Sequence, residues 1–238
     1  MKIAIGSIFR NSSSYLDRYV SQVKELDYLV SEGHLLFPIL VEGDSTDDTW
    51  ERLTRLAGRS KVIKREHGGK WYSSGSEGTE ERWRGISYAC DGVLEAVELD
   101  VDIFIYVESD LIWEPETMMK LVGPVRDLGP SVLVPMCFYG PQPTVFYDTY
   151  GFWKDGVQFT NEAPYHPSLA DWRGGFQEFV EVDSAGSCLV MRGDVARNCR
   201  FDPPEKGIVG FCENIRANDY RIWLDPAEAV IHPKLENK

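Results

Sequence analysis

Short apolar segments and amphipathic segments alternate through the first half of the sequence. Four apolar or alternating segments predict strands: residues 2–9, 35–41, 61–64 and 102–107. Three segments between them predict helices: residues 14–30, a segment that begins at Asp48, and residues 79–99. This order predicts an α/β fold with a mainly parallel sheet covered by helices on both faces. Pro38 lies inside the second predicted strand and favours an edge strand or a short one.

The second half of the sequence is less regular, with aromatic and Pro-rich connections. Strands are predicted at residues 131–138, 145–150, 176–192, 220–224 and 229–232, and a short helix at about 210–218. Two stretches poor in apolar residues, 65–81 and 161–175, predict loops. We therefore expect a single domain over residues 1–238, in which residues 1–125 and 126–238 are two halves of one fold.

The chain is strongly acidic, with a formal net charge of −13 at pH 7. Such a surface repels phosphate backbones, so duplex nucleic acid is disfavoured as a partner without being excluded. A locally basic groove from Lys61, Lys64, Arg65 and Lys70 would be the exception. An acidic surface is also compatible with a site that collects a divalent cation.

No feature of the sequence predicts a membrane or secretory protein. The chain contains no apolar run of about 18 residues, so no membrane-spanning helix is expected. The first residues lack the long apolar region and cleavage site of a signal peptide. The five cysteines show no CxxC spacing and are odd in number, which favours free core thiols and a cytoplasmic location.

Two carboxylates follow the strand predicted at residues 102–107. In "IYVESDLIW", Glu108 and Asp110 are two residues apart, so both side chains leave the same face if the strand continues. Carboxylate oxygens suit Mg²⁺ or Mn²⁺, and such an ion neutralises charge on a diphosphate leaving group. Acidic residues are also common at solvated strand ends, and the spacing alone leaves both interpretations open.

A second acidic segment, "VEGDSTDDTW", follows the strand predicted at residues 35–41. Glu42 and Asp44 would accept hydrogen bonds from a ribose or from the edge of a base, and Gly43 between them permits a sharp turn. The alternative is ordinary turn and cap chemistry, because Asp, Ser and Thr cap helices without any functional role.

Three further residues are candidates for contacts with a metal or with anions. His232 ends the last predicted strand, where it is either a metal ligand or a structural residue. Arg10, after the first strand, and Arg84, in the helix of residues 79–99, are candidate phosphate partners or members of ordinary ion pairs. Arg82 competes with Arg84 for this role, and helical periodicity does not decide between them.

Taken together, these segments resemble the nucleotide-sugar glycosyltransferases of the GT-A fold. "RNSSSYL", "VEGDSTDDT", "YVESDLIWEPETM" and "NDYRIWLDPAEAVIHP" occur in the order and spacing of that class. The third segment looks like the metal-binding DXD segment, with Glu108 in its first position, and the last looks like the terminal metal-ligand histidine. The resemblance implies a Rossmann-like mixed sheet in which residues 1–125 bind nucleotide and residues 126–238 bind acceptor.

The same resemblance implies roles for the candidate residues. The metal, Mn²⁺ or Mg²⁺, would be held by Asp110 and His232, with Glu108 aligned beside them. The nucleotide sugar would be contacted by residues at the strand ends and in the preceding helix: Arg10, Glu42, Asp44, Arg84, Glu108 and Ser109.

Two stretches narrow the likeness to a subgroup. "VFYDTYGFWKDG" and "VEVDSAGSCLVMRGDV" are similar to the fungal capsule-associated mannosyltransferases and related bacterial and phage enzymes. This implies a mannosyl- or glucosyl-type donor, with Tyr147 and Asp148 on the acceptor side. Aromatic rings such as Trp172 would stack on an acceptor sugar or base, or fill the core of the second half.

The catalytic carboxylate is not obvious from the sequence. Members of this class usually carry an acidic residue a few positions before the segment matching "GFC", whereas "EKGIVGFCEN" has Gly207, Ile208 and Val209 there. Asp183 is therefore the first candidate and Glu205 the second, and Asp183 is equally well explained as a turn residue. If no protein base acts, the leaving-group phosphate would take the proton and the reaction would retain configuration.

The predicted function is a metal-dependent glycosyltransferase that moves a hexose from a UDP- or GDP-linked donor to an acceptor hydroxyl. The acceptor is a glycan, a protein or a modified nucleobase. One alternative is a nucleotidyltransferase, although "GSIFRNSSS" lacks the Gly-rich, basic loop that a triphosphate requires. The other is a nucleotide-sugar-binding protein without transferase activity, which the missing acid favours.

Overall fold

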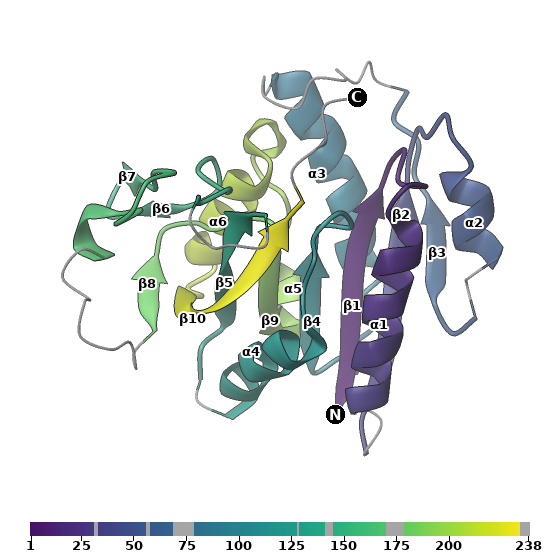
Figure 1. Cartoon of the computed structure of the whole chain (residues 1–238), viewed down its shortest axis with the longest axis horizontal. Coiled ribbons are helices and arrows are strands. Elements are labelled where there is room, and N and C mark those ends of the chain that lie inside the picture. The colour runs from purple at the N-terminus through teal and green to yellow at the C-terminus, as the bar shows by residue number, and fades with distance from the viewer. Residues whose placement is uncertain are drawn as a thin grey trace.

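The computed structural model describes residues 1–30, 33–55, 58–68, 79–127, 129–140, 145–169 and 179–233. Over these residues the chain forms one eight-stranded sheet with the order β3-β2-β1-β4-β9-β5-β10-β8 (Figure 1). The strands are β1 (Lys2–Phe9), β2 (Leu35–Glu42), β3 (Lys61–Lys64), β4 (Ile103–Val107), β5 (Val132–Tyr139), β8 (Val180–Val182), β9 (Cys188–Arg192) and β10 (Ile222–His232). Both halves of the sequence contribute to this sheet.

The sheet is mixed and mainly parallel, as predicted. Strands β3, β2, β1 and β4 pair in parallel, and β10 pairs in parallel with β5. Strand β9 is antiparallel to both β4 and β5, so β5 again runs in the direction of β4. As a result β1–β5 and β10 all have their carboxyl ends at the same edge, which is the upper edge in Figure 1.

Helices cover both faces of the sheet, which confirms the predicted α/β architecture. The helices are α1 (Leu16–Val30), α2 (Thr49–Arg55), α3 (Glu80–Glu95), α4 (Pro115–Asp127), α5 (Gly193–Asn198) and α6 (Ile208–Ala217), with short 3₁₀ turns at Pro167–Leu169 (η1) and Pro204–Lys206 (η2). Helices α1 and α4 share one apolar core with the sheet, and α3, α5 and α6 share the other. A two-stranded hairpin, β6 (Trp153–Lys154) and β7 (Val157–Gln158), lies beside the main sheet.

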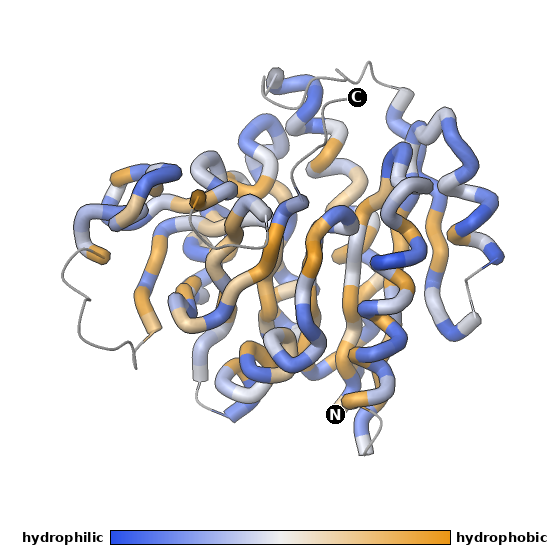
Figure 2. Tube along the Cα trace, in the orientation of Figure 1, coloured by the Kyte–Doolittle hydropathy of each residue, from blue (hydrophilic) through white to orange (hydrophobic). Residues whose placement is uncertain are grey.

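Strand β4 shows why these residues form a central strand. All five of its side chains are buried. Ile103 and Ile105 pack in the core under α1 and α4, whereas Phe104 and Tyr106 pack under α3. Because both faces of a central strand are covered, its sequence is continuously apolar rather than alternating. Figure 2 shows the same hydrophobic concentration along the inner strands.

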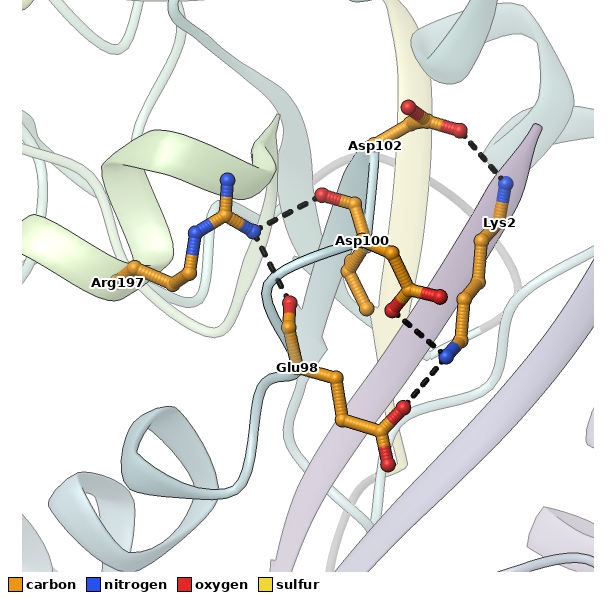
Figure 3. Close-up of polar contacts among 6 residues, drawn as sticks. Lys2, Glu98, Asp100, Asp102 and Arg197 are labelled. Carbon is orange, nitrogen blue, oxygen red and sulfur yellow. Dashed lines mark hydrogen bonds and ion pairs between the residues drawn. The ribbon is translucent and has the colours of Figure 1, made fainter.

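The amino ends of β1 and β4 are joined by a polar network at the edge opposite their carboxyl ends (Figure 3). The Lys2 ammonium lies 2.5 Å from a Glu98 oxygen and 2.8 Å from an Asp100 oxygen, and the Lys2 backbone N–H donates to Asp102 at 2.7 Å. Arg197 of α5 donates to the carbonyl oxygens of Glu98 and Val101. These contacts explain the charged residues of this segment without any role in a site.

The structure corrects several predicted elements. Strand β2 is neither an edge strand nor short: it is eight residues long and lies between β3 and β1. Pro38 is tolerated there because β3 pairs with β2 only from Ile39 onward. The strand predicted at residues 145–150 is wrong; Phe146 makes one isolated bridge to Phe138, and the Asp148 side chain then holds a turn by accepting from the Gly151 N–H.

The remaining corrections concern strand ends and one helix. The described part of the 176–192 segment is two strands, β8 and β9, separated at Ser187, whose φ of 58° does not fit an extended strand. The strands predicted at 220–224 and 229–232 are one strand, β10, with a register shift between Asp225 and Ala229. Helix α4 was not predicted, because Gly123 and Pro124 weaken its helical signal. No described helix has the length and apolar composition needed to cross a bilayer.

Candidate functional site

A cavity of about 670 Å³ lies at the edge where the carboxyl ends of the parallel strands meet. Residues that follow four neighbouring strands line it: Arg10 after β1, Gly43 after β2, Arg65 after β3 and Glu108 after β4. Helix α3 and the segment from Tyr147 to Tyr150 form further walls. Ligands of open α/β sheets bind at this edge, so the cavity is the candidate site.

Asp110 and His232 meet at this edge although they are far apart in the sequence. Ile112 and Ile231 exchange two backbone hydrogen bonds of 2.8 Å, which fixes the segment after β4 against the end of β10. The Asp110 carboxylate then lies 3.3 Å from the His232 Nε2 atom. The His232 Nδ1 atom lies 2.9 Å from the Pro233 carbonyl oxygen, which can only accept, so Nδ1 carries the hydrogen of the neutral ring.

This geometry fits a metal ion. A metal ion binds the neutral form of an imidazole ring, in which Nδ1 keeps its hydrogen toward Pro233 and Nε2 offers its lone pair beside the Asp110 carboxylate. An octahedral ion with metal–ligand distances of about 2.1 Å places neighbouring ligands about 3 Å apart, close to the observed separation. A carbonyl that fixes the ring tautomer is also the usual partner of a metal-ligating histidine.

Aromatic rings hold His232 in place. The Tyr147 ring stacks on the imidazole, with ring centres 3.9 Å apart and an angle of 17° between the planes. Tyr139 contacts both rings edge-on. Burial raises the pKa of the Tyr147 hydroxyl, so this ring is neutral at ordinary pH. Tyr147, predicted on the acceptor side, thus lines the cavity and supports the candidate metal ligand.

Glu108 and Asp148 lie in the same part of the cavity wall. Burial, and then the charges of Asp110 and Asp148, raise the pKa of the half-buried Glu108 carboxyl. Asp148 is buried, and burial likewise raises its pKa, although hydrogen bonds from Ser187 and Gly151 oppose the shift. The Ser187 hydroxyl donates to Asp148 at 2.8 Å, and the Ser187 carbonyl accepts from the Glu108 N–H at 2.9 Å. Ser187 therefore joins the two acidic segments.

Glu42, predicted to bind the nucleoside, is buried at the end of β2. One of its carboxylate oxygens accepts from the Ser45 N–H at 2.9 Å. The other, Oε2, is buried and has no hydrogen-bond partner among the described residues. Such an atom is costly unless a ligand or water satisfies it. Glu42 does not itself line the cavity, whereas the adjacent Gly43 does.

The other predicted nucleotide contacts divide into cavity residues and structural ones. Arg10 lines the cavity, and burial lowers its pKa. Ser109 also lines it, but its hydroxyl donates to the Ile8 carbonyl and joins β4 to β1. Asp44 lies behind the wall, where its carboxylate accepts from the backbone N–H groups of His67 and Gly68.

Arg82 and Arg84 differ in their location relative to the cavity. Arg82 lines the cavity, and its positive charge opposes the rise in the pKa of Glu108. Arg84 lies outside the cavity and pairs with Glu205 at 3.1 Å. The cavity wall therefore carries Arg82, together with Arg65 and His67, which follow β3.

The two predicted catalytic carboxylates also lie outside the cavity. Asp183 accepts from the Gly156 N–H at 2.8 Å and pairs with Arg216 at 3.3 Å, the contacts of a turn residue. The Glu205 carboxylate forms an ion pair with Arg84. Trp172 is outside the described residues. Tyr165 packs edge-on against Phe138 and serves the core of the second half.

Sequence reasoning missed part of the cavity. The Trp83 and Tyr150 rings stack with centres 4.5 Å apart, and both line it. Arg18 of α1 donates to the Asp110 carbonyl oxygen at 2.6 Å and so helps to hold the acidic segment. No short motif marks these residues, because each reaches the site from a different element. Only the spacing of four residues between Arg18 and the buried Gln22 indicates that Arg18 lies beside the buried face of α1.

Solved structures with the same architecture include complexes with UDP or a UDP-linked sugar. One is TarS 1–349 of S. aureus in complex with UDP-GlcNAc, with a TM-score of 0.60, 15% identity, and coverage of 100% of this chain and 60% of TarS 1–349. Another is GalNAc-T7 with UDP, GalNAc and Mn²⁺, with a TM-score of 0.63, 17% identity, and coverage of 99% of this chain and 44% of that one.

A third is glucosyl-3-phosphoglycerate synthase from Mycobacterium tuberculosis with Mn²⁺, UDP and glucosyl-3-phosphoglycerate. It matches with a TM-score of 0.55 and 17% identity, over 100% of this chain and 72% of its own. The chain has the GT-A glycosyltransferase fold. It spans about 60% of the length of TarS 1–349. No family model matches the sequence, and no curated protein matches it in a sequence comparison.

The described residues would supply only part of the coordination sphere of a metal ion. Over the described residues, no three or more His, Cys, Asp or Glu side chains are grouped to hold a metal ion. Asp110 and His232 would be two ligands of such an ion, and the cavity beside them is wide enough to admit further ligand atoms. An ion bound here would be completed by water or by oxygens of a bound substrate, as is usual for Mg²⁺.

Proposed function

We propose that the chain is a metal-dependent glycosyltransferase that moves a hexose from a UDP- or GDP-linked donor to an acceptor hydroxyl. The observation that carries the proposal is the Asp110–His232 pair, which lies 3.3 Å apart beside the cavity at the carboxyl ends of the strands. The fold shared with sugar-transferring enzymes supports it, and two of those structures contain UDP and Mn²⁺.

A nucleoside diphosphate suits the charge distribution of the cavity. Arg10 and Arg82 line it in a chain whose net charge is −13, so two positive charges lie where the phosphates of a ligand would bind, opposite the acidic Glu108 and Asp110. Glu42, buried behind the strand ends with one unsatisfied oxygen, would accept a hydrogen bond from the nucleoside. These contacts favour a nucleotide, and the sequence resemblance to the capsule-associated mannosyltransferases favours a mannosyl or glucosyl group on it.

The residues at the carboxyl ends of the strands would have different roles in the reaction. Asp110 and His232 would hold Mn²⁺ or Mg²⁺, which when bound offsets the charge that develops on a departing diphosphate. Glu108 lies beside the pair and would orient the donor. Tyr147 and Asp148 would face the acceptor. Arg82 replaces Arg84 as the proposed phosphate contact, because Arg82 lines the cavity and Arg84 does not.

The nucleotidyltransferase alternative has less support. The segment after β1 holds no Gly-rich loop: the Arg10 N–H donates to the Ser12 hydroxyl, and the Ser12 N–H donates to Thr49. These amides are used within the protein and are not directed at a triphosphate. A binding protein without transferase activity would use the same cavity, so only turnover separates it from the proposal.

The acceptor is proposed only as a hydroxyl-bearing glycan, protein or nucleobase in the cytoplasm. A duplex-binding groove is disfavoured, because Lys64 pairs with Glu66 and Arg65 pairs with Glu95. These pairs neutralise the basic residues that would have formed such a groove with Lys61, and Lys70 is outside the described residues.

The proposal is tested with a panel of UDP-, GDP- and CDP-sugars with and without Mn²⁺. Donor binding to the folded state raises the unfolding temperature by mass action. We expect one nucleotide to give a Mn²⁺-dependent shift, and nucleoside diphosphate to be released from its sugar. A shift without any release on prolonged incubation supports the binding-protein alternative, and no shift with any donor contradicts the proposal.

A further inference from the structure

The cavity is lined by three carboxylates among the described residues: Glu108, Asp110 and Asp148. Asp110 faces His232, and Glu108 lies two residues before it at the end of the same strand. Asp148 reaches the cavity from a different segment, between Phe146 and Gly151, in the second half of the chain. It is thus the one carboxylate of the three that does not belong to the acidic strand end.

The wall contributed by α6 and by the chain before η2 is apolar. Phe201 and Ile208 line the cavity there. The nearby Glu205 forms an ion pair with Arg84. The Asp183 carboxylate pairs with Arg216 and accepts a hydrogen bond from the Gly156 N–H. Neither carboxylate lines the cavity, so a proton acceptor for a bound hydroxyl has to come from another wall.

Asp148 is held in one position. Its Oδ1 atom accepts from the Gly151 N–H at 3.2 Å, and its Oδ2 atom accepts from the Ser187 hydroxyl at 2.8 Å. Gly186 packs directly against the carboxylate, since a Cβ atom there would lie 2.3 Å from Oδ2. Each carboxylate oxygen accepts one protein hydrogen bond and keeps a second lone pair, so capacity to take a proton remains.

We propose that Asp148 is the catalytic base that removes the proton from the acceptor hydroxyl. This inference rests on the proposed glycosyltransferase function and names the residue that performs its proton transfer. It replaces Asp183 and Glu205, which sequence reasoning favours. The neighbours Tyr147, Thr149 and Tyr150 also line the cavity, so an acceptor would lie along this segment.

The reaction is then a single displacement. The acceptor oxygen forms a bond to the anomeric carbon while its proton passes to Asp148. The bond from the anomeric carbon to the diphosphate oxygen breaks, and the nucleoside diphosphate leaves with the electron pair. Asp148 afterwards loses the proton to solvent, so the products are the glycoside, the nucleoside diphosphate and one proton. A direct displacement of this kind inverts the anomeric configuration.

Asp148→Asn tests the proposal, because the amide keeps the shape, accepts from the Gly151 N–H through its oxygen and can donate to a rotated Ser187 hydroxyl through its nitrogen, but is not a base. Release of nucleoside diphosphate with water as acceptor is measured for the donor that the wild-type chain turns over. We expect a loss of about 100-fold or more, the usual contribution of a general base. The Mn²⁺-dependent unfolding shift with that donor is expected to stay as in the wild type.

Asp183→Asn is the matched comparison, because it makes the same substitution at a carboxylate outside the cavity. We expect its turnover to stay within about twofold of wild type, as is usual for a substitution away from the reacting groups. Loss of turnover in Asp183→Asn with retention in Asp148→Asn overturns the assignment, and so does full turnover in both. A product of retained anomeric configuration, determined by NMR, also overturns it.

Failure of the proposed function has a different signature. A wild-type chain that releases no nucleoside diphosphate from any donor contradicts the transferase proposal itself, and the base assignment falls with it. A wild-type chain that turns over its donor, with Asp148→Asn equally active, contradicts the base assignment alone.

Discussion

Ile112 and Ile231 donate a backbone hydrogen bond to each other, each 2.8 Å long. Asp110 lies two residues before Ile112, and His232 directly follows Ile231. A short backbone bridge thus brings the end of a strand in the first half of the chain against the end of the last strand. The separation of 3.3 Å between the two side chains is a product of this bridge. Changes to the rings around His232 should therefore alter the site without unfolding it.

Tyr147 is the ring whose substitution tests how His232 is positioned. Its stack on His232, at 3.9 Å, fixes the plane of the imidazole. We expect Tyr147→Leu to weaken Mn²⁺ binding by about 10-fold, the low end of effects seen when support of a ligating histidine is removed. The measurement is a Mn²⁺ titration of the unfolding temperature, in the presence of the nucleoside diphosphate that stabilises the wild-type chain.

Tyr147→Phe is the control for this substitution. The phenyl ring keeps the stack and lacks only the hydroxyl, so its Mn²⁺ affinity should match that of wild type. Equal affinity in Tyr147→Leu and wild type would show that the stack does not position the ligand.

The contact between Gly186 and Asp148 predicts a loss of stability on adding one methyl group. The nearest atoms to a Cβ at Gly186 all belong to the Asp148 carboxylate, the closest at 2.3 Å. We expect Gly186→Ala to lower the free energy of unfolding by about 1–3 kcal/mol, as overpacking does in tight sites. Urea denaturation of the variant measures it.

A double-mutant cycle isolates the cause. In an Asp148→Ala background the carboxylate is gone, so Gly186→Ala should cost much less than in the wild-type background. An unchanged cost would place the strain in the backbone and not against Asp148.

Asp91 of α3 provides a pH-dependent prediction outside the cavity. Burial raises its pKa, although its carboxylate accepts from the Phe201 N–H at 3.0 Å. An acid with a raised folded-state pKa binds more protons folded than unfolded, so its contribution to stability falls as pH rises from its ordinary pKa of 3.8. Asp91→Asn keeps an acceptor for Phe201 and does not ionise.

The measured quantity is the difference in unfolding free energy between Asp91→Asn and the wild-type chain. It should move in favour of the variant as pH rises from about 3.5 to about 7. Acids whose pKa is lowered, such as Asp194 beside Arg192, cause the opposite trend in both proteins and cancel in the difference. A difference that is constant with pH would contradict the burial argument.

The first half of the fold was predictable because β1 and β4 are buried on both faces and short strand segments alternate with amphipathic helices. The bounds of β1 and β3 were correct, and β4 and β2 differed by one residue, because continuous apolar runs between amphipathic helices have few other arrangements. The convergence of Glu108, Asp110 and His232 also followed from the sequence, since all three lie at carboxyl ends of strands.

The acceptor side was not predictable in the same way. Asp183 and Asp148 each lie three residues before a glycine, and only tertiary packing turns Asp148 into the cavity and Asp183 toward Arg216. Arg82 and Arg84 lie in the same helix turn, and tertiary contacts again determine which of them lines the cavity. Arg84 forms an ion pair with Glu205 outside it. These contacts join elements that are far apart in the sequence, so the spacing of residues along the chain does not predict them.

The most direct test of the account measures metal-dependent release of nucleoside diphosphate by the wild-type chain and by Asp110→Ala. Glu114→Ala is the matched control, because it removes an exposed carboxylate from the same segment that does not line the cavity. We predict Mn²⁺-dependent turnover in wild type and in Glu114→Ala, and loss of both turnover and the Mn²⁺-dependent unfolding shift in a folded Asp110→Ala. Full metal-dependent turnover by Asp110→Ala would contradict the central claim.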